Sequence, residues 1–190
     1  RTYVVNWEHN GKDIHEYNKV PMNYNGAPVR AKKFYFKPGY TWTTVSSGGF
    51  SARFIPGGSI FDNGGCTLFS NQHIHVYGSL LNSSIALRYL SLLSPTLNFQ
   101  PGDIGKIPVV DNLISLHIEE RANKLIELGK TDWDFQEISW DFGKHHFLSN
   151  NVYQTTISAT YDLALSTWCT MTQDMRRLEE DNNRIFIDAY

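Results

Sequence analysis

The chain has 190 residues, of which 41% are hydrophobic and 14% aromatic, a composition typical of a folded globular protein with room for one core plus an attached helical element. No stretch approaches the ~20 apolar residues that a bilayer-spanning helix needs, so the sequence predicts no membrane insertion. Its 17 Lys and Arg against 19 Asp and Glu give a formal net charge of -2, a balance that argues against a uniformly basic, polyanion-coating protein.

The first seventy residues predict short strands separated by turns. Aromatic and β-branched runs favour strands because they pack on a pleated surface, while Gly and Pro supply turn dihedrals. Asn10-Gly11 and Pro38-Gly39 are two such turn signals. The runs cover residues 3–7, 33–36, 40–45, 50–55 and 59–61. A small antiparallel or mixed sheet is expected.

The apolar spacing then changes to a helical period. In residues 74–93 apolar side chains recur every three or four positions, and Ser94-Pro95 ends the pattern. Residues 96–99 are expected to return as a strand. Two longer stripes follow at residues 110–128, ended by Gly129, and at residues 157–178. Each would expose a continuous apolar seam if left alone, so we expect an antiparallel helical pair.

Three further features concern the connector, the cysteines and the ends of the chain. Residues 133–147 are crowded with rings and acids and are interpreted as a connector packed onto the helices. Cys66 and Cys169 lack Cys-x-x-Cys spacing, which predicts two free, buried thiols in a reducing cytoplasm. The chain begins with Arg1 and has no signal peptide, which indicates a piece of a longer polypeptide.

Together these elements predict an α+β fold with a β-rich part, residues 1–108, and a helical part, residues 109–190. The charge divides at the same point. Residues 1–108 hold ten Lys and Arg against five Asp and Glu, whereas residues 109–190 hold seven against fourteen. Because a polyanion meets the local field of one face and not the sum over the molecule, the β-rich part is where we expect a nucleic-acid surface.

The candidate contact residues lie in a carboxylate-free stretch. Between Tyr17 and Phe61 there are six Lys and Arg and no Asp or Glu. Lys, Arg, Ser and Thr donors bind phosphate oxygens, and Arg can bridge the two acceptors of a guanine edge. The expected phosphate contacts are Lys32, Lys33 and Lys37. The expected contacts to bases or nearby backbone are Arg30, Arg53, Thr43, Thr44, Ser46, Ser47 and Ser51. A solvated strand face with turn serines remains an alternative.

Histidine clusters are weaker candidates for a site. His73 with His75, and Asp141 with His145 and His146, could be drawn as metal sites, since imidazoles and carboxylates suit transition metals. Neither cluster has a recognised ligand spacing. We therefore interpret them as surface or capping histidines and predict no metal.

No familiar catalytic motif is present in the sequence. It lacks a Walker-type phosphate loop, a Gly-x-Ser-x-Gly elbow and a Gly-x-Gly-x-x-Gly turn. It also lacks the Asn-Pro-Pro-Tyr or Asp-Pro-Pro-Tyr tetrad with which amino-group methyltransferases hold an extruded base. We therefore expect recognition from these residues, with no catalytic residue and no bound cofactor.

Two groups of segments carry a resemblance to a known family. The first begins with Trp42-Thr43-Thr44-Val45-Ser46-Ser47 and comprises residues 42–54, 58–62, 80–83, 94–104 and 107–109. The second comprises residues 130–134, 139–142 and 178–187. In this order they resemble the post-catalytic region of BREX phage-exclusion adenine methyltransferases, the PglX family. The cofactor-binding and base-holding motifs of that family would lie upstream of Arg1.

The resemblance implies an architecture and a role. The chain is also similar to specificity portions of type I and type IIG restriction-modification enzymes, in which a target recognition domain leads into a helical spacer. Residues 1–108 would then read double-stranded DNA, and residues 109–190 would be a spacer or docking surface. The whole enzyme would transfer a methyl group from S-adenosylmethionine to an extruded adenine. We hypothesise that the chain is the target recognition region of such a DNA adenine N6-methyltransferase.

Two alternatives stay open at this point. The acidic, aromatic-rich helical part could make the chain an interaction module that docks another defence-system subunit. Trp7, Trp42 and the tyrosines could instead belong to a carbohydrate-binding β domain. Phosphate binding must depend on ionic strength and sugar binding must not, which separates the last alternative from DNA recognition.

Overall fold

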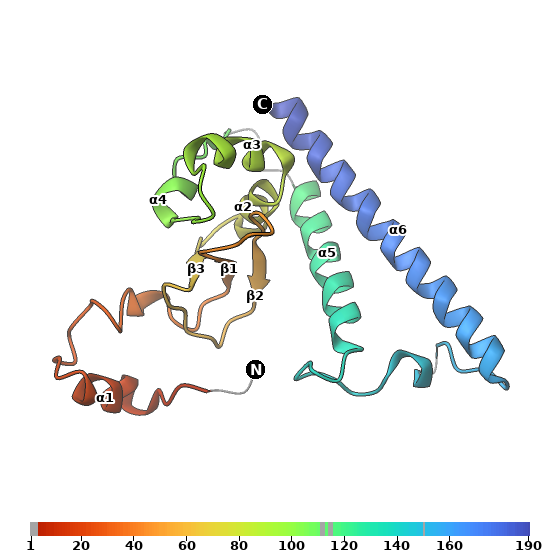
Figure 1. The fold of residues 1–190 in the computed structure, drawn as a ribbon, viewed down its shortest axis with the longest axis horizontal. Coiled ribbons are helices and arrows are strands. Elements are labelled where there is room, and N and C mark those ends of the chain that lie inside the picture. Colours follow the sequence, from red (N-terminus) through yellow and green to blue (C-terminus); the bar gives the residue numbers. More distant parts are fainter. Residues whose placement is uncertain (1–3, 111–112, 114–115, 150) are drawn as a thin grey trace.

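A computed structural model describes residues 4–110, 113, 116–149 and 151–190. A small sheet and short helices pack against two long helices, as Figure 1 shows, so the predicted α+β class is confirmed. None of the helices in the described ranges is long and apolar enough to cross a membrane. The elements are α1 (Glu8–Tyr17), a 3-10 turn (Lys32–Phe34), β1 (Gly39–Thr43), β2 (Arg53–Ile55), β3 (Gly65–Leu68), α2 (Ile74–Leu81), α3 (Ser84–Leu93), α4 (Pro101–Ile104), α5 (Leu116–Asp134), a second 3-10 turn (His146–Leu148) and α6 (Ile157–Ala189).

The sheet has β1 at its centre, with β2 and β3 antiparallel on either side. Tyr40 and Trp42 point to the core face and are 4% and 2% exposed. The Trp42 indole donates a hydrogen bond of 2.9 Å to the Phe99 carbonyl oxygen. Helix α2 approaches Tyr40 so closely that a Cβ at Gly78 would lie 2.1 Å from the tyrosine ring. Glycine is therefore required where α2 crosses β1.

The predicted strands are confirmed in part. Residues 40–45 contain β1, and residues 50–55 contain the shorter β2. Residues 59–61 are not a strand. The third strand, β3, was missed because it has only four residues and begins with the second glycine of Gly64-Gly65. Residues 96–99 contribute only an isolated bridge between Val45 and Asn98.

The two earliest predicted strands are wrong. Of residues 3–7, Tyr3 lies outside the described residues, and residues 4–7 lead into α1 without forming a strand. The turn expected at Asn10-Gly11 is present inside α1, where both residues have positive φ angles of 60° and 76°. Residues 33 and 34 belong to the 3-10 turn Lys32–Phe34 and residues 35 and 36 to the turn after it, with positive φ at Ala31 and Phe36. These bends let the aromatic rings pack on one another instead of extending along the sheet.

The single helix predicted for residues 74–93 is two helices. The chain breaks between α2 and α3 at Asn82 and Ser83. Ser83 is the N-cap of α3, with extended backbone and a hydroxyl that accepts a hydrogen bond of 3.2 Å from the Ala86 N–H. Asn and Ser side chains compete for backbone groups in this way, which explains why the helix ends although the apolar period continues.

The antiparallel helical pair is confirmed, since α5 and α6 run in opposite directions and contact each other (Figure 1). The start predicted at residue 110 falls largely on residues 111, 112, 114 and 115, which lie outside the described residues. Gly129 does not end α5, which continues to Asp134. Lys130 forms an ion pair with Asp134 one turn later, which supports this last turn.

One hydrophobic core joins the sheet to the helices. Its members come from both sides of residue 108, with Ile118 and Phe186 packed into the same cluster as Tyr40, Trp42 and Leu90. Phe186 is fully buried near the end of α6. The division into residues 1–108 and 109–190 thus does not separate two hydrophobic cores. It stays a prediction that the first part reads DNA and the second part is a spacer or docking surface.

The cysteines are free, but the prediction that both are buried is wrong. Cys169 is exposed on α6, and Cys66 on the edge strand β3 is half-buried. Because α6 buries only one side, a small residue on its outer face stays in water.

Candidate nucleic-acid interface

The face of the sheet opposite the core is polar. Side chains of directly paired residues point to the same face, and the pairing joins Thr41 to both Arg53 and Thr67. Thr43, two residues along β1, shares this face. The Thr41 and Thr67 hydroxyls donate to the carbonyl oxygens of Cys66 and Gly65, at 3.0 Å and 3.3 Å. Thr43 and Arg53 are the exposed members of this face and offer a hydroxyl and a guanidinium to solvent. Thr41 and Thr67 were missed in the sequence, although Thr41 alternates with Thr43 at the spacing of a strand.

The fold brings the two candidate arginines to one end of β1. The Arg53 guanidinium donates a hydrogen bond of 2.9 Å to Thr43 Oγ1. The Arg30 guanidinium donates one of 3.1 Å to Asn63 Oδ1, and the Asn63 carbonyl oxygen accepts from the Thr44 hydroxyl. We call Arg30, Thr43, Thr44, Arg53 and Asn63 the arginine edge. Asn63 was missed; its position in a turn before Gly64-Gly65 is the signal that could have found it.

The cations of the basic stretch are not neutralised by acids. None of the ion pairs in the described part of the chain involves Lys19, Arg30, Lys32, Lys33, Lys37 or Arg53. Some acids of the helical part instead pair with a cation of the same part, as Asp134 and Asp141 do with Lys130. The positive field of the β-rich part is therefore available to a ligand.

The three candidate lysines have different surroundings. Lys32 is half-buried; its Nζ donates a hydrogen bond of 2.6 Å to the Met22 carbonyl oxygen and lies 3.4 Å from His15 Nε2, so its ammonium already has partners within the chain. Lys33 and Lys37 are exposed, with Nζ atoms 5.0 Å and 5.6 Å from the Phe34 ring centroid. These two lysines are better placed for phosphate than Lys32.

The candidate serines are spread out beyond the arginine edge. Ser46 and Ser47 follow β1, where the Ser46 N–H bonds to the Leu97 carbonyl oxygen at 3.0 Å. Ser51 is exposed and lines a hollow of about 400 Å³ between the sheet and the helices. The structure therefore groups Arg30, Arg53, Thr43 and Thr44, and separates Ser51 from them.

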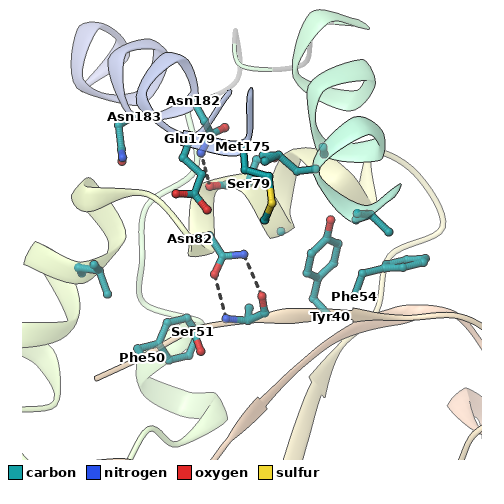
Figure 2. Close-up of a pocket in the computed structure, with 16 residues that line it drawn as sticks. Tyr40, Phe50, Ser51, Phe54, Ser79, Asn82, Met175, Glu179, Asn182 and Asn183 are labelled. Carbon is teal, nitrogen blue, oxygen red and sulfur yellow. Dashed lines mark hydrogen bonds between the residues drawn. The ribbon is translucent and has the colours of Figure 1, made fainter. Parts of the chain in front are cut away.

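A side-chain clasp locks the sheet to the helices across that hollow, as Figure 2 shows. Asn82 Oδ1 accepts from the Ala52 N–H, and Asn82 Nδ2 donates to the Ala52 carbonyl oxygen, both at 2.9 Å. A second bond joins α6 to α2, where Asn182 Nδ2 donates a hydrogen bond of 3.1 Å to the Ser79 carbonyl oxygen. The sheet, α2 and α6 are thereby fixed relative to one another.

Tyr40 and His75 make a second polar contact beneath the sheet. The Tyr40 hydroxyl lies 3.1 Å from His75 Nδ1. Burial raises the pKa of Tyr40 to about 12, and burial lowers the pKa of His75. Both groups are thus neutral near pH 7, which suits a structural hydrogen bond.

The histidine clusters hold no metal-ligand set. Among the described residues no group of three His, Cys, Asp or Glu side chains could hold a metal ion. His73 Nδ1 instead lies 3.0 Å from Glu119 on α5, and His145 caps the 3-10 turn by accepting from the Phe147 N–H. His146 is 3% exposed between Phe135 and Trp168.

Comparison with known proteins finds relatives in the family that the sequence segments resemble. No family model matches the chain. The chain is 39% identical over 152 residues to the adenine-specific methyltransferase BrxX of Escherichia coli O9:H4 (strain HS), which covers 78% of the chain and 12% of that protein. It is 34% identical over 200 residues to the adenine-specific methyltransferase PglX of Lacticaseibacillus casei (strain Zhang), which covers 99% of the chain and 16% of that protein.

Identities of 39% and 34% over 78% and 99% of the chain define the family to which it belongs. The chain belongs to the BREX methyltransferase family of BrxX and PglX, which confirms the predicted resemblance. It spans 12% and 16% of the lengths of these two relatives.

Proposed function

We propose that the chain recognises a sequence in double-stranded DNA on behalf of an adenine-specific methyltransferase. The observation that carries the proposal is the arginine edge. Arg30 and Arg53 lie exposed at one end of β1, free of carboxylate partners in the described ranges and each held by a neutral oxygen. A guanidinium oriented by a neutral acceptor keeps donors for the two acceptors of a guanine edge.

The remaining donors would position the duplex. Lys33 and Lys37 supply charge to the phosphates, and the exposed Thr43 supplies a hydroxyl donor. β Strands can enter the major groove, where base edges present their donors and acceptors. The acidic helices would act as a spacer that repels the phosphates and so orients the basic part toward DNA.

The chemistry would belong to other parts of the methyltransferase. S-adenosylmethionine would supply the methyl group, and the target adenine would leave the base stack to reach the catalytic centre. This chain would select the DNA sequence to be methylated. It would do so in the cytoplasm, where the DNA is. None of its own residues is assigned a catalytic role.

A pair of single variants tests the division of labour between the arginine edge and the lysines. Arg53→Ala should cost about 1–3 kcal/mol and relax preference at the base it reads, because a base contact carries sequence information. Lys33→Ala should weaken all sequences alike, because phosphate is the same everywhere. Lys124→Ala, an exposed lysine on α5, is the matched control. Equal effects of Arg53→Ala and Lys33→Ala on every duplex in a competition assay would contradict the assignment.

A second candidate function, docking of another defence-system subunit, is favoured by the surface where α5 and α6 diverge (Figure 1). Large apolar side chains are exposed there: Trp133 at 52%, Ile138 at 68%, Ile157 at 90% and Tyr161 at 52%. Exposed aromatics of this kind often anchor protein interfaces. Purified subunits encoded beside a PglX relative should co-sediment with the chain, and Trp133→Ser with Tyr161→Ser should abolish this without changing duplex affinity.

A further inference from the structure

A second hollow, distinct from the arginine edge, lies along the free edge of β3. Its volume is about 650 Å³. It is bounded by the segment before β1, by β3 and by residues of α2 and α4. Its walls are mainly apolar, and the side chains that matter for the argument are Phe34, Phe61, Thr67, Phe69 and Tyr77. We call this hollow the β3 groove.

Three phenylalanines form a row in the β3 groove. The rings of Phe34 and Phe69 are stacked, with centroids 5.1 Å apart and planes inclined by 12°. The Phe61 ring follows, 5.1 Å from Phe69 and inclined by 50°. All three side chains are half-buried, so part of each ring stays accessible. A row of partly exposed rings in a groove offers a stacking surface for a flat ligand.

Two cations lie at one end of this row. The Nζ atoms of Lys33 and Lys37 are 5.0 Å and 5.6 Å from the Phe34 centroid. Both lysines are exposed, and neither forms an ion pair with a carboxylate in the described ranges. Two ammonium groups beside one ring create a local positive potential that favours an anion.

We propose that the β3 groove binds one nucleotide unit, with its base against the phenylalanine row and its phosphate on Lys33 and Lys37. The volume lies within the ~300–1,000 Å³ of ordinary ligand pockets. Stacking on rings is tolerant of base identity, and lysine binds phosphate as a point charge. The unit is either a free mononucleotide or an unstacked nucleotide of a nucleic acid. The inference does not require sequence reading by the arginine edge, although Lys33 and Lys37 enter both.

Calorimetric titration with the four nucleoside 5′-monophosphates tests the site on the intact chain. We expect a monophosphate to bind at least about tenfold more tightly than the matching nucleoside or inorganic phosphate, because it engages rings and lysines together. Lys33→Ala and Lys37→Ala should each weaken binding several-fold, and Phe69→Leu should weaken it by removing a ring. Lys124→Ala, far along the chain on α5, should leave it unchanged.

A DNA duplex that contains 2-aminopurine distinguishes a free mononucleotide from an unstacked nucleotide of DNA. The fluorescence of 2-aminopurine rises when this base leaves the stack. A rise that Phe69→Leu abolishes and Lys124→Ala preserves assigns the groove to a nucleotide of DNA, whereas saturable binding of monophosphates alone assigns it to a free ligand. The proposal is overturned if neither probe binds, if inorganic phosphate binds as tightly as the nucleotides, or if both lysine variants bind like the wild type. The lysine variants keep the test decisive even if Phe69→Leu fails to fold.

Discussion

Replacing Asn82 by alanine should destabilise the fold more than any other single change of a polar side chain described above. The amide of Asn82 makes two hydrogen bonds of 2.9 Å to the N–H and carbonyl of one residue, Ala52. Ala52 is 7% exposed, so water cannot fully replace either bond. An unsatisfied buried polar group costs ~1–3 kcal/mol, which places the loss at about 2–6 kcal/mol for the two groups.

Urea unfolding followed by tryptophan fluorescence measures this loss. The buried Trp42 lies on the strand next to the clasp and reports on the sheet. Asn71→Ala, an exposed asparagine in the loop before α2, is the matched control and should change the free energy of unfolding by less than ~0.5 kcal/mol. If Asn82→Ala behaves like Asn71→Ala, the clasp does not hold the sheet to the helices.

Two further predictions concern the core and its pH dependence. Gly78→Ala should lower the free energy of unfolding by several kcal/mol in the same assay, because its Cβ would lie 2.1 Å from the Tyr40 ring and no small shift relieves that clash. A variant as stable as the wild type would refute the packing of α2 on β1. Burial, followed by the charge of His145, lowers the pKa of His146, so the unfolded chain binds this proton more readily. The contribution of His146 to stability is therefore present above pH ~6.5 and is lost as the pH falls through the folded pKa. His146→Phe should flatten the fall in unfolding free energy between pH ~7 and ~5, and an unchanged slope would show that His146 is not the group responsible.

The helices were more predictable than the strands. A long apolar period predicts a helix wherever it occurs, which is why the pair α5 and α6 followed from the sequence. The same period runs through Asn82 and Ser83 and hides the break between α2 and α3, since the break depends on side-chain bonds to Ala52 and Ala86. Strand β3 is too short to show an alternation, and it exists because β1 pairs with it.

The candidate site was predictable by residue type but not by position. A carboxylate-free stretch identifies basic residues, yet only the tertiary fold brings Arg30 and Arg53 to one end of β1. Lys32 and Lys33 are equivalent in sequence, whereas the structure turns Lys32 inward to the Met22 carbonyl oxygen. Distances between distant segments decide such roles, and no local pattern encodes them.

The salt dependence of duplex binding tests the central claim, a positive recognition surface for DNA, most directly. With Kd measured by fluorescence anisotropy between ~50 and ~200 mM salt, the logarithm of affinity should fall linearly with a slope of about 0.9 per phosphate contact. Lys33→Ala should reduce that slope by about one unit, and Lys124→Ala should not. Binding that does not change with salt, or a slope unaffected by Lys33→Ala, would contradict the account.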